Sequence, residues 1–286
     1  WSVDGHPCIR FDRPAERFVS STYHAGDVAI GLRGRPPSRS CRCEVGLATA
    51  AAMFPADESG KAAARATVDL SFDKTIKTLY PRGRPESWAE ALAGCAELDV
   101  PDDRFDFLYR AAVRSIAVLS PDDSYPGPYT YKRFWFRDAA LILHAVLCAN
   151  MPGRARQGLK GFLERQRVSG YFHSQSGEWD SNGQVLWLLG RLVELTGEGL
   201  PGDWRGPVER GARWIRHKRT GRREDALHAG LLPAGFSAEH LGTNDYYYWD
   251  DFWSVSGLRA AAALSSRWGR EDDARELLEE AGDLSA

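Results

Sequence analysis

The chain has 286 residues, of which 43% are hydrophobic, so it is long enough to bury a large core as one big domain or as two unequal ones. Its formal charge of −2 and its pI near 6.4 exclude the broad basic field typical of nucleic-acid binding and the polybasic patch typical of membrane surfaces. No window approaches the roughly 18 apolar residues that a membrane helix needs, and residues 1–20 lack a signal-peptide pattern. We therefore expect neither a nucleic-acid partner nor a membrane.

The cysteines predict a reducing environment, because their odd count argues against a closed disulfide framework. They are Cys8, Cys41, Cys43, Cys95 and Cys148. Their spacing fits no metal site, and Cys41 and Cys43 are better explained as small hydrophobic residues than as a redox pair. We expect a cytoplasmic protein that needs no metal or organic cofactor.

From Trp1 to about residue 73 the sequence lacks helical periodicity, and Gly, Pro and Arg separate short apolar runs typical of strands. The expected strands are residues 9–11, 27–32, 43–48 and 66–72, while 48–54 fits either a strand or a short helix. We interpret residues 1–78 as a sandwich-like antiparallel β-sheet segment, with earlier strands expected before Trp1. Residues 79–100, with Pro81, Gly83 and Pro85, are the expected linker.

Residues 101–286 change to helix after helix. Apolar residues spaced by three and four predict helices over 105–116, from 137, from 153, and over 183–195, 207–218, 252–268 and 270–280. Long loops, 120–136, 167–182 and 219–251, alternate with short turns. In a toroid of antiparallel helical hairpins, every second connection lies on the same rim, so these loops are expected to meet at one mouth.

The first two loops carry aromatic side chains beside charged ones. Trp135-Phe-Arg-Asp138 sets rings next to Arg137 and Asp138, a combination that suits a sugar because the rings stack and the charged groups meet hydroxyls. The alternative is a helix cap with a surface ion pair. Trp179, Asp180 and Gln184 form a second hydroxyl-reading surface, although Asp180 also fits a plain helix N-cap.

The third loop is the best candidate for chemistry, because it places Glu239, Asp250 and Asp251 among aromatic residues that include Trp249. Apolar neighbours raise the pKa of a carboxyl group, as a general acid requires. The alternative is that Asp250 and Asp251 cap the next helix and that Glu239 is a solvated loop residue.

This order of parts resembles the glucoamylase-like enzymes of glycoside hydrolase family 15 and, more broadly, the six-hairpin glycosidases. The resemblance rests on Trp135-Phe-Arg-Asp138, on Trp179 with Gln184, and on Glu239-x-x-Gly242 before an aromatic run. It implies that Arg137 and Asp138 clamp the hydroxyls of the released glucose and that Trp179, and less securely Gln184, line the same pocket.

The same resemblance implies that Glu239 is the general acid, with Asp250 and Asp251 as rivals, and that Trp135, Trp179 and Trp249 stack on sugar. The family's catalytic base lies in a late hairpin, and about seven of twelve expected helices are present, so we expect a fragment or a degenerate barrel. The expected function is inverting release of a terminal sugar, glucose from an α-linked oligosaccharide or polysaccharide. A non-catalytic sugar-binding toroid, a phosphorylase and a scaffold for a protein partner remain alternatives.

Overall fold

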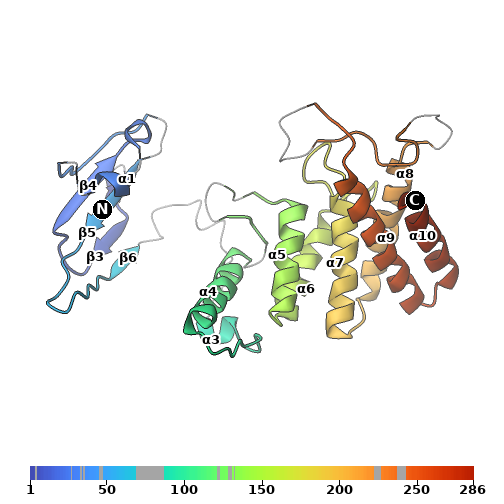
Figure 1. The fold of residues 1–286 in the computed structure, drawn as a ribbon, viewed down its shortest axis with the longest axis horizontal. Coiled ribbons are helices and arrows are strands. Elements are labelled where there is room, and N and C mark those ends of the chain that lie inside the picture. Colours follow the sequence, from blue (N-terminus) through green and yellow to red (C-terminus); the bar gives the residue numbers. More distant parts are fainter. Residues whose placement is uncertain are drawn as a thin grey trace. The chain divides into compact units, whose positions relative to one another are not determined.

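The computed structural model describes residues 1–3, 5–26, 28–32, 34, 36–44, 48–68, 87–120, 123–127, 131, 133–221, 227–236 and 243–286. The chain divides into two compact units, Trp1–Pro85 and Glu86–Ala286 (Figure 1). Residues 79–86 of the expected linker lie outside the described residues, and residues 87–100 lie in the second unit.

The described strands of the first unit form three antiparallel pairs. They are β1 (Ser2–Val3) with β2 (His6–Pro7), β3 (Ile9–Phe11) with β6 (Ala66–Val68), and β4 (Arg17–Ser21) with β5 (Thr49–Met53). Phe11 makes an edge-to-face contact with Trp1 and a tilted contact with Phe54, with ring centroids 5.2 Å and 5.1 Å apart. The predicted antiparallel β character of this part of the chain is confirmed.

The ambiguous segment 48–54 forms a strand, β5, because its backbone pairs along the whole of β4. The expected strand 27–32 is wrong, since Val28–Gly31 forms the short helix α1 after a 3-10 turn at Tyr23–Ala25. A short apolar run satisfies either structure, so periodicity alone does not separate them. Residues 43, 44 and 48 lie outside strands, and residues 45–47 and 69–72 lie outside the described part.

The second unit is helical. Its helices are α3 (Trp88–Ala91), α4 (Asp103–Leu119), α5 (Phe136–Cys148), α6 (Pro152–Glu164), α7 (Ser181–Thr196), α8 (Arg205–Lys218), α9 (Tyr248–Arg267) and α10 (Glu271–Leu284), with a 3-10 turn at Gly202–Trp204. The seven predicted helices correspond to α4 to α10, except that α9 begins at Tyr248 rather than at 252 and α10 ends at Leu284 rather than at 280.

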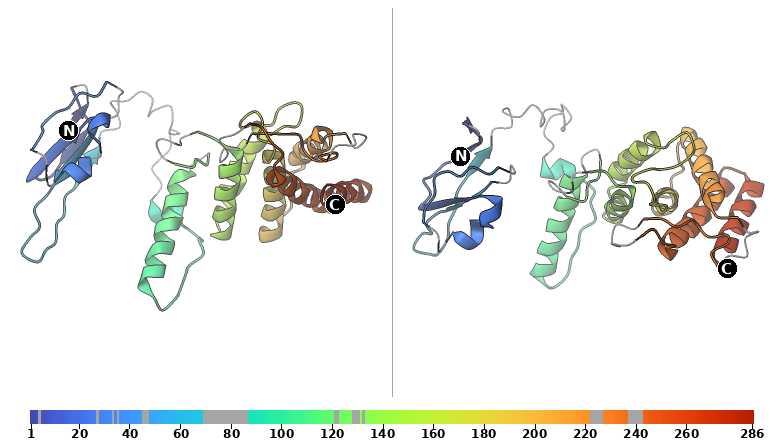
Figure 2. Two further views of the ribbon diagram at one scale, coloured as in Figure 1. Left: turned by 45° about the horizontal axis from the view of Figure 1, so that its top comes forward. Right: turned by 90° about the horizontal axis from the view of Figure 1, so that it is seen from above.

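Three of these helices, α5, α7 and α9, form an inner row, with α7 packed against both neighbours. Helix α6 lies against α5 and α7, α8 lies against α7 and α9, and α10 lies against α9. The loops that lead into α5, α7 and α9 gather at one end of the row, which we call the rim (Figures 1 and 2). Leu186, Leu188 and Leu189 of α7 are fully buried, as a central helix requires.

Glycines let α7 and α9 approach closely near the rim. A Cβ atom on Gly183 of α7 would lie 2.2 Å from the carbonyl oxygen of Trp253, and one on Gly257 of α9 would lie 2.6 Å from the Cα atom of Gly183. Neither position accepts a larger residue without moving a helix. The start of α7 is therefore fixed against α9 by contact between backbones.

Candidate active site

The starts of α5, α7 and α9 meet at the carboxylate of Asp180. Its Oδ2 atom accepts hydrogen bonds from Arg137 Nε at 2.6 Å, Trp249 Nε1 at 2.8 Å and Gln184 Nε2 at 3.0 Å. Arg137 lies in the first turn of α5, and Trp249 lies in the first turn of α9. Asp180 is 1% exposed and Gln184 is fully buried. A single oxygen atom thus joins three segments that are far apart in sequence.

Asp180 precedes α7 at the N-cap position but does not cap the helix. Its side chain makes no capping hydrogen bond, and its backbone is helical, with φ −69° and ψ −26°, whereas capping residues are usually extended. The carboxylate is directed to Arg137 and Trp249 instead. The interpretation of Asp180 as a plain cap, which the sequence left open, is therefore wrong.

Arg137 is held in one orientation by its neighbours. In addition to the Asp180 contact, its Nη2 atom lies 3.8 Å from Glu178 Oε1, and its guanidinium carbon lies 6.0 Å from the ring centroid of Trp249. Its side chain is 15% exposed, so the pair with Asp180 is not a surface ion pair. A guanidinium fixed in this way has a defined orientation, as hydroxyl recognition needs.

Asp250 and Asp251 lie within the first turn of α9 and are each 4% exposed. The N-cap of α9 is Tyr247, so the alternative that the two aspartates cap this helix is wrong. Asp251 Oδ1 accepts a hydrogen bond from the Leu232 amide at 2.9 Å. Among the described residues, the carboxyl group of Asp250 has no hydrogen-bond partner. The carboxyl group of Asp251 is therefore held by a backbone hydrogen bond, whereas that of Asp250 has no such bond among the described residues.

Burial raises the pKa of Asp250 to about 8, and the negative charge of Asp180 adds to this effect while Arg137 opposes it. Burial also raises the pKa of Asp251, against the amide of Leu232 and the charge of Arg219. Asp250 consequently carries a proton at neutral pH, next to the carboxylate of Asp180. A buried carboxylic acid that keeps its proton is suited to donate it.

Trp179 belongs to an aromatic group with Tyr171 and Trp214. Tyr171 stacks on Trp214 with ring centroids 4.3 Å apart, and Trp179 is tilted against both rings. The Nζ atom of Lys218 lies 3.7 Å from the centroid of the Trp179 ring. The Tyr171 hydroxyl donates a hydrogen bond to the carbonyl of Glu178 at 2.5 Å, so this group supports the turn that carries Asp180.

The remaining predicted residues are placed as follows. Trp135 precedes α5 and packs with Arg133, whose guanidinium carbon lies 4.9 Å from its ring centroid. Asp138 is half-buried in the first turn of α5. Trp249 is 46% exposed and leaves part of its ring open at the rim. Glu239 lies outside the described residues.

Sequence reasoning assigned no role to the supporting residues Glu178, Tyr171, Trp214, Lys218 and Leu232. Glu178 stands directly before Trp179 and Asp180, so its charge was a visible signal. Trp214 and Lys218 lie on α8, which looked like an ordinary amphipathic helix. Only the fold brings them to the Asp180 turn.

The comparisons with known proteins bear on the fold. No protein-family model matches the sequence, and no curated protein matches it. A crystal structure of a bacterial glucoamylase complexed with acarbose matches 96% of this chain with a TM-score of 0.50 and 13% sequence identity. The chain has a glucoamylase-like fold. The predicted toroid of the six-hairpin type, mainly α and preceded by antiparallel strands, is thereby confirmed as a fold.

The likeness has two limits. At 13% identity it shows the fold alone, and the chain spans 43% of the length of that glucoamylase. Residues that bind or react are therefore argued from the geometry of this chain.

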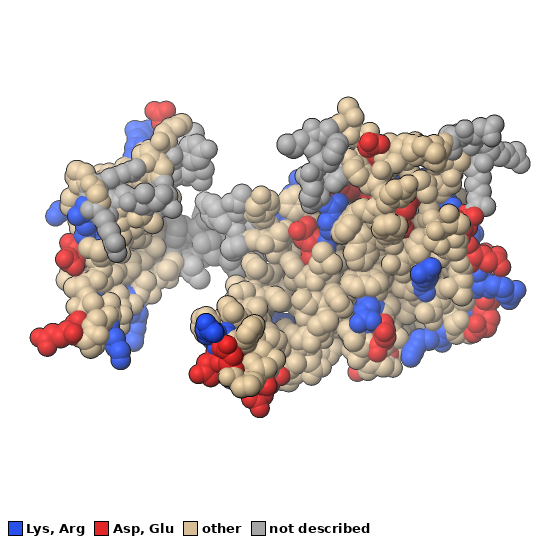
Figure 3. All heavy atoms as spheres, in the orientation of Figure 1, with Lys and Arg blue, Asp and Glu red and all other residues tan. Residues whose placement is uncertain are grey.

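Other features of the described residues concern partners and cofactors. No helix in the described ranges is long and apolar enough to cross a membrane, and no group of three or more potential ligands there is arranged to hold a metal ion. All five cysteines are described, and none of them is joined to another in a disulfide bond. On the face drawn in Figure 3, acidic and basic side chains are interspersed, in keeping with the net charge of −2.

Proposed function

We propose that this protein is a glycoside hydrolase that releases a terminal sugar, glucose from an α-linked oligosaccharide or glucan, with inversion at the anomeric carbon. The observation that carries the proposal is the buried junction of Arg137, Trp249 and Gln184 on Asp180, at the rim of a glucoamylase-like fold. Its chemistry is that of a site that reads hydroxyl groups.

The junction orients hydrogen-bonding groups that can meet the hydroxyls of a sugar. All three donors bond to Oδ2 of Asp180, so its other oxygen accepts a hydroxyl, and the guanidinium of Arg137 donates to a neighbouring hydroxyl. The open part of the Trp249 ring stacks on the C–H face of the sugar, and we extend this role to Trp135 and Trp179. Asp138 completes the clamp. The result is orientation of the terminal sugar, which lowers the entropy cost of the reaction.

In the proposed reaction, water attacks the anomeric carbon while the bond to the leaving oxygen breaks. A carboxylic acid protonates that oxygen, and a carboxylate on the opposite face takes the proton from water. Glu239 is the proposed acid. Asp250 is its rival, since it is buried beside Asp180 and protonated at neutral pH. We assign Asp251 a different role, because its Oδ1 atom accepts the Leu232 amide.

Calorimetry with an iminosugar analogue of glucose tests the binding step. We expect the parent chain to bind it and Arg137→Lys to bind at least about tenfold more weakly, because Lys cannot reproduce the fixed fork of donors. Arg259→Lys, on the exposed surface of α9, is the matched control and should bind like the parent. A folded parent chain that does not bind the analogue would remove the basis of the proposal.

Turnover tests the chemistry. In a chain that carries the expected base, an α-linked glucose oligosaccharide should yield β-glucose first, as seen by NMR. Glu239→Gln should abolish this release while sparing sugar binding, whereas Asp250→Asn should not abolish it. The reverse result assigns the acid to Asp250. Initial release of α-glucose would contradict inversion.

A non-catalytic sugar-binding toroid is the second candidate. It is favoured by the engagement of two rim carboxylates, Asp180 and Asp251, in hydrogen bonds to the protein, as expected of groups that hold the rim together. Iminosugar binding without turnover, with or without added phosphate, would support it. Turnover that depends on phosphate would instead indicate a phosphorylase.

A further inference from the structure

The connection from α8 to α9 contains a segment, residues 230–236, that is tied to four parts of the second unit. Thr220, just after α8, anchors its start: the Thr220 hydroxyl donates to the carbonyl of His228 at 2.8 Å and accepts from the Gly230 amide at 3.0 Å. The Thr220 amide donates to the carbonyl of Leu231 at 2.8 Å. These bonds close the first part of the connection into a fixed loop.

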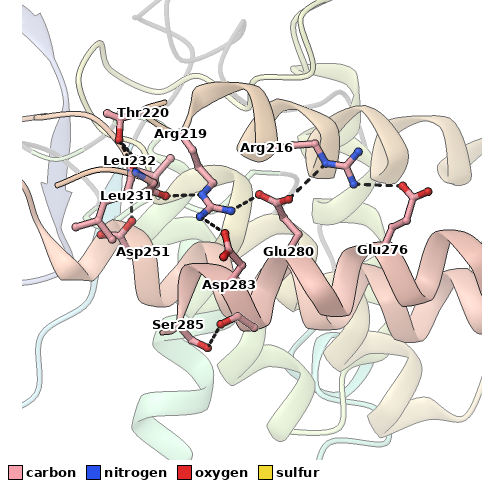
Figure 4. A network of polar contacts seen from close by, with 12 residues as sticks. Arg216, Arg219, Thr220, Leu231, Leu232, Asp251, Glu276, Glu280, Asp283 and Ser285 are labelled. Atoms are coloured by element: carbon pink, nitrogen blue, oxygen red, sulfur yellow. Dashed lines mark hydrogen bonds and ion pairs between the residues drawn. The ribbon is translucent and has the colours of Figure 1, made fainter. Parts of the chain in front are cut away.

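Arg219 ties the same segment to α10. Its Nε atom donates to the carbonyl of Gly230 at 2.5 Å, while its two terminal nitrogens pair with Glu280 and Asp283. Figure 4 shows Arg219 extending from the end of α8 to these two carboxylates on α10. The Arg219 side chain is 7% exposed and its two partners are 20% and 30% exposed, so this is a half-buried junction rather than a surface ion pair.

Asp251 ties the segment to α9. Its Oδ1 atom accepts the Leu232 amide at 2.9 Å, and both residues are buried (Figure 4). A carboxylate that accepts a backbone N–H in such a site makes a strong, charge-assisted hydrogen bond. Because α9 also carries Trp249 and Asp250, this bond connects the segment with the helix that contributes to the Asp180 junction.

The far end of the segment lies against the turn that carries Trp179 and Asp180. The Phe236 amide donates to the carbonyl of Gly177 at 2.8 Å. A Cβ atom on Gly235 would lie 2.7 Å from Nε1 of Trp179, so only glycine lets the two come this close. Any shift of the segment therefore changes the packing of Trp179.

We propose that Asp251 is a positioning residue, which holds the 230–236 segment against Trp179 through the Leu232 amide and so keeps the Trp179–Asp180 turn in place for sugar. The effect of this role on sugar binding rests on the proposed function, whereas the hydrogen bond between Asp251 and the Leu232 amide does not. It separates the roles of the two adjacent aspartates: Asp250 faces the Asp180 junction, and Asp251 faces the segment behind it.

Comparison of Asp251→Asn with Asp251→Ala tests the inference. Asparagine keeps an oxygen that accepts the Leu232 amide and lacks the charge, whereas alanine removes the acceptor. We expect Asp251→Asn to keep slow hydrogen exchange at the Leu232 amide and an iminosugar affinity within about threefold of the parent. Asp251→Ala should lose that protection and bind at least about tenfold more weakly, with exchange in α7 unchanged.

The outcomes are distinguishable. Equal damage in both variants, or unchanged Leu232 exchange in Asp251→Ala, would overturn the positioning role. If the folded parent does not bind the iminosugar, the proposed function fails, and the exchange comparison still decides whether Asp251 fixes the segment. If Asp251→Ala does not fold, Thr220→Val replaces it, because it releases the start of the same segment; unchanged affinity in that variant would also count against the inference.

Discussion

Replacing Asp180 by Asn is the most direct test of whether its carboxylate anchors the starts of α5, α7 and α9. The substitution keeps the shape of the side chain but removes the charge that Arg137 faces at 2.6 Å, at a residue that is 1% exposed. Removing one member of a buried ion pair costs about 3–5 kcal/mol, because the other charge remains buried. Glu178, 3.8 Å from Arg137, still offsets part of that charge. We therefore expect a loss at the lower end, about 3 kcal/mol.

Urea denaturation followed by circular dichroism measures this loss, with the slope against urea serving to check that the transition is unchanged. The matched control is Glu194→Gln, which breaks the exposed pair with Arg191 and should cost less than about 1 kcal/mol. If Asp180→Asn costs no more than this control, the carboxylate is not an anchor of the rim, and the reasoning about the site is refuted.

Two further predictions concern stability. Because burial holds the pKa of Asp250 at about 8, above its ordinary value of 3.8, the stability that its neutral form provides is present below pH 4 and is lost as pH rises to 8. Asp250→Asn should therefore gain stability relative to the parent across this range, by up to about 6 kcal/mol, in melts at a series of pH values; a constant difference would contradict this. Gly183→Ala should lose about 2–3 kcal/mol because its Cβ atom meets the backbone of α9, whereas Gly282→Ala, with open space on α10, should gain about 0.5–1 kcal/mol. Equal effects in denaturant titrations would contradict the close packing of α7 on α9.

The sequence predicted the helices well because their periodicity is local. It placed the start of α9 too late, since the aromatic and acidic run from Tyr246 to Asp251 has no apolar period of three and four. Once α9 begins at Tyr248, Asp250 and Asp251 become buried first-turn residues instead of caps. Packing between helices, rather than the local sequence pattern, therefore decides where α9 begins and that these two aspartates are buried.

The site was predictable in its members but not in its connections. Arg137, Asp180 with Gln184, and Trp249 were chosen from three separate stretches of the chain, and the structure joins them through hydrogen bonds to Asp180. What local rules missed was the use of Asp180: a residue before a helix is expected to cap it, and only neighbours distant in sequence redirect its carboxylate. The sequence makes Asp251 a candidate acid beside Glu239, and the hydrogen bond that it accepts from the Leu232 amide is likewise not visible in the sequence.

The length of chain between the partners of Asp180 bears on how the protein folds. Arg137 and Trp249 lie 43 and 69 residues away from it, so neither contact forms within one hairpin. Local helices close first, and contacts that span such distances carry the larger cost of loop closure. The junction is therefore expected to appear late in folding, after α5, α7 and α9 have docked. Ligand binding at the rim would then show that the three helices have assembled. A chain that stops before α9 is expected to be helical but not to bind the iminosugar.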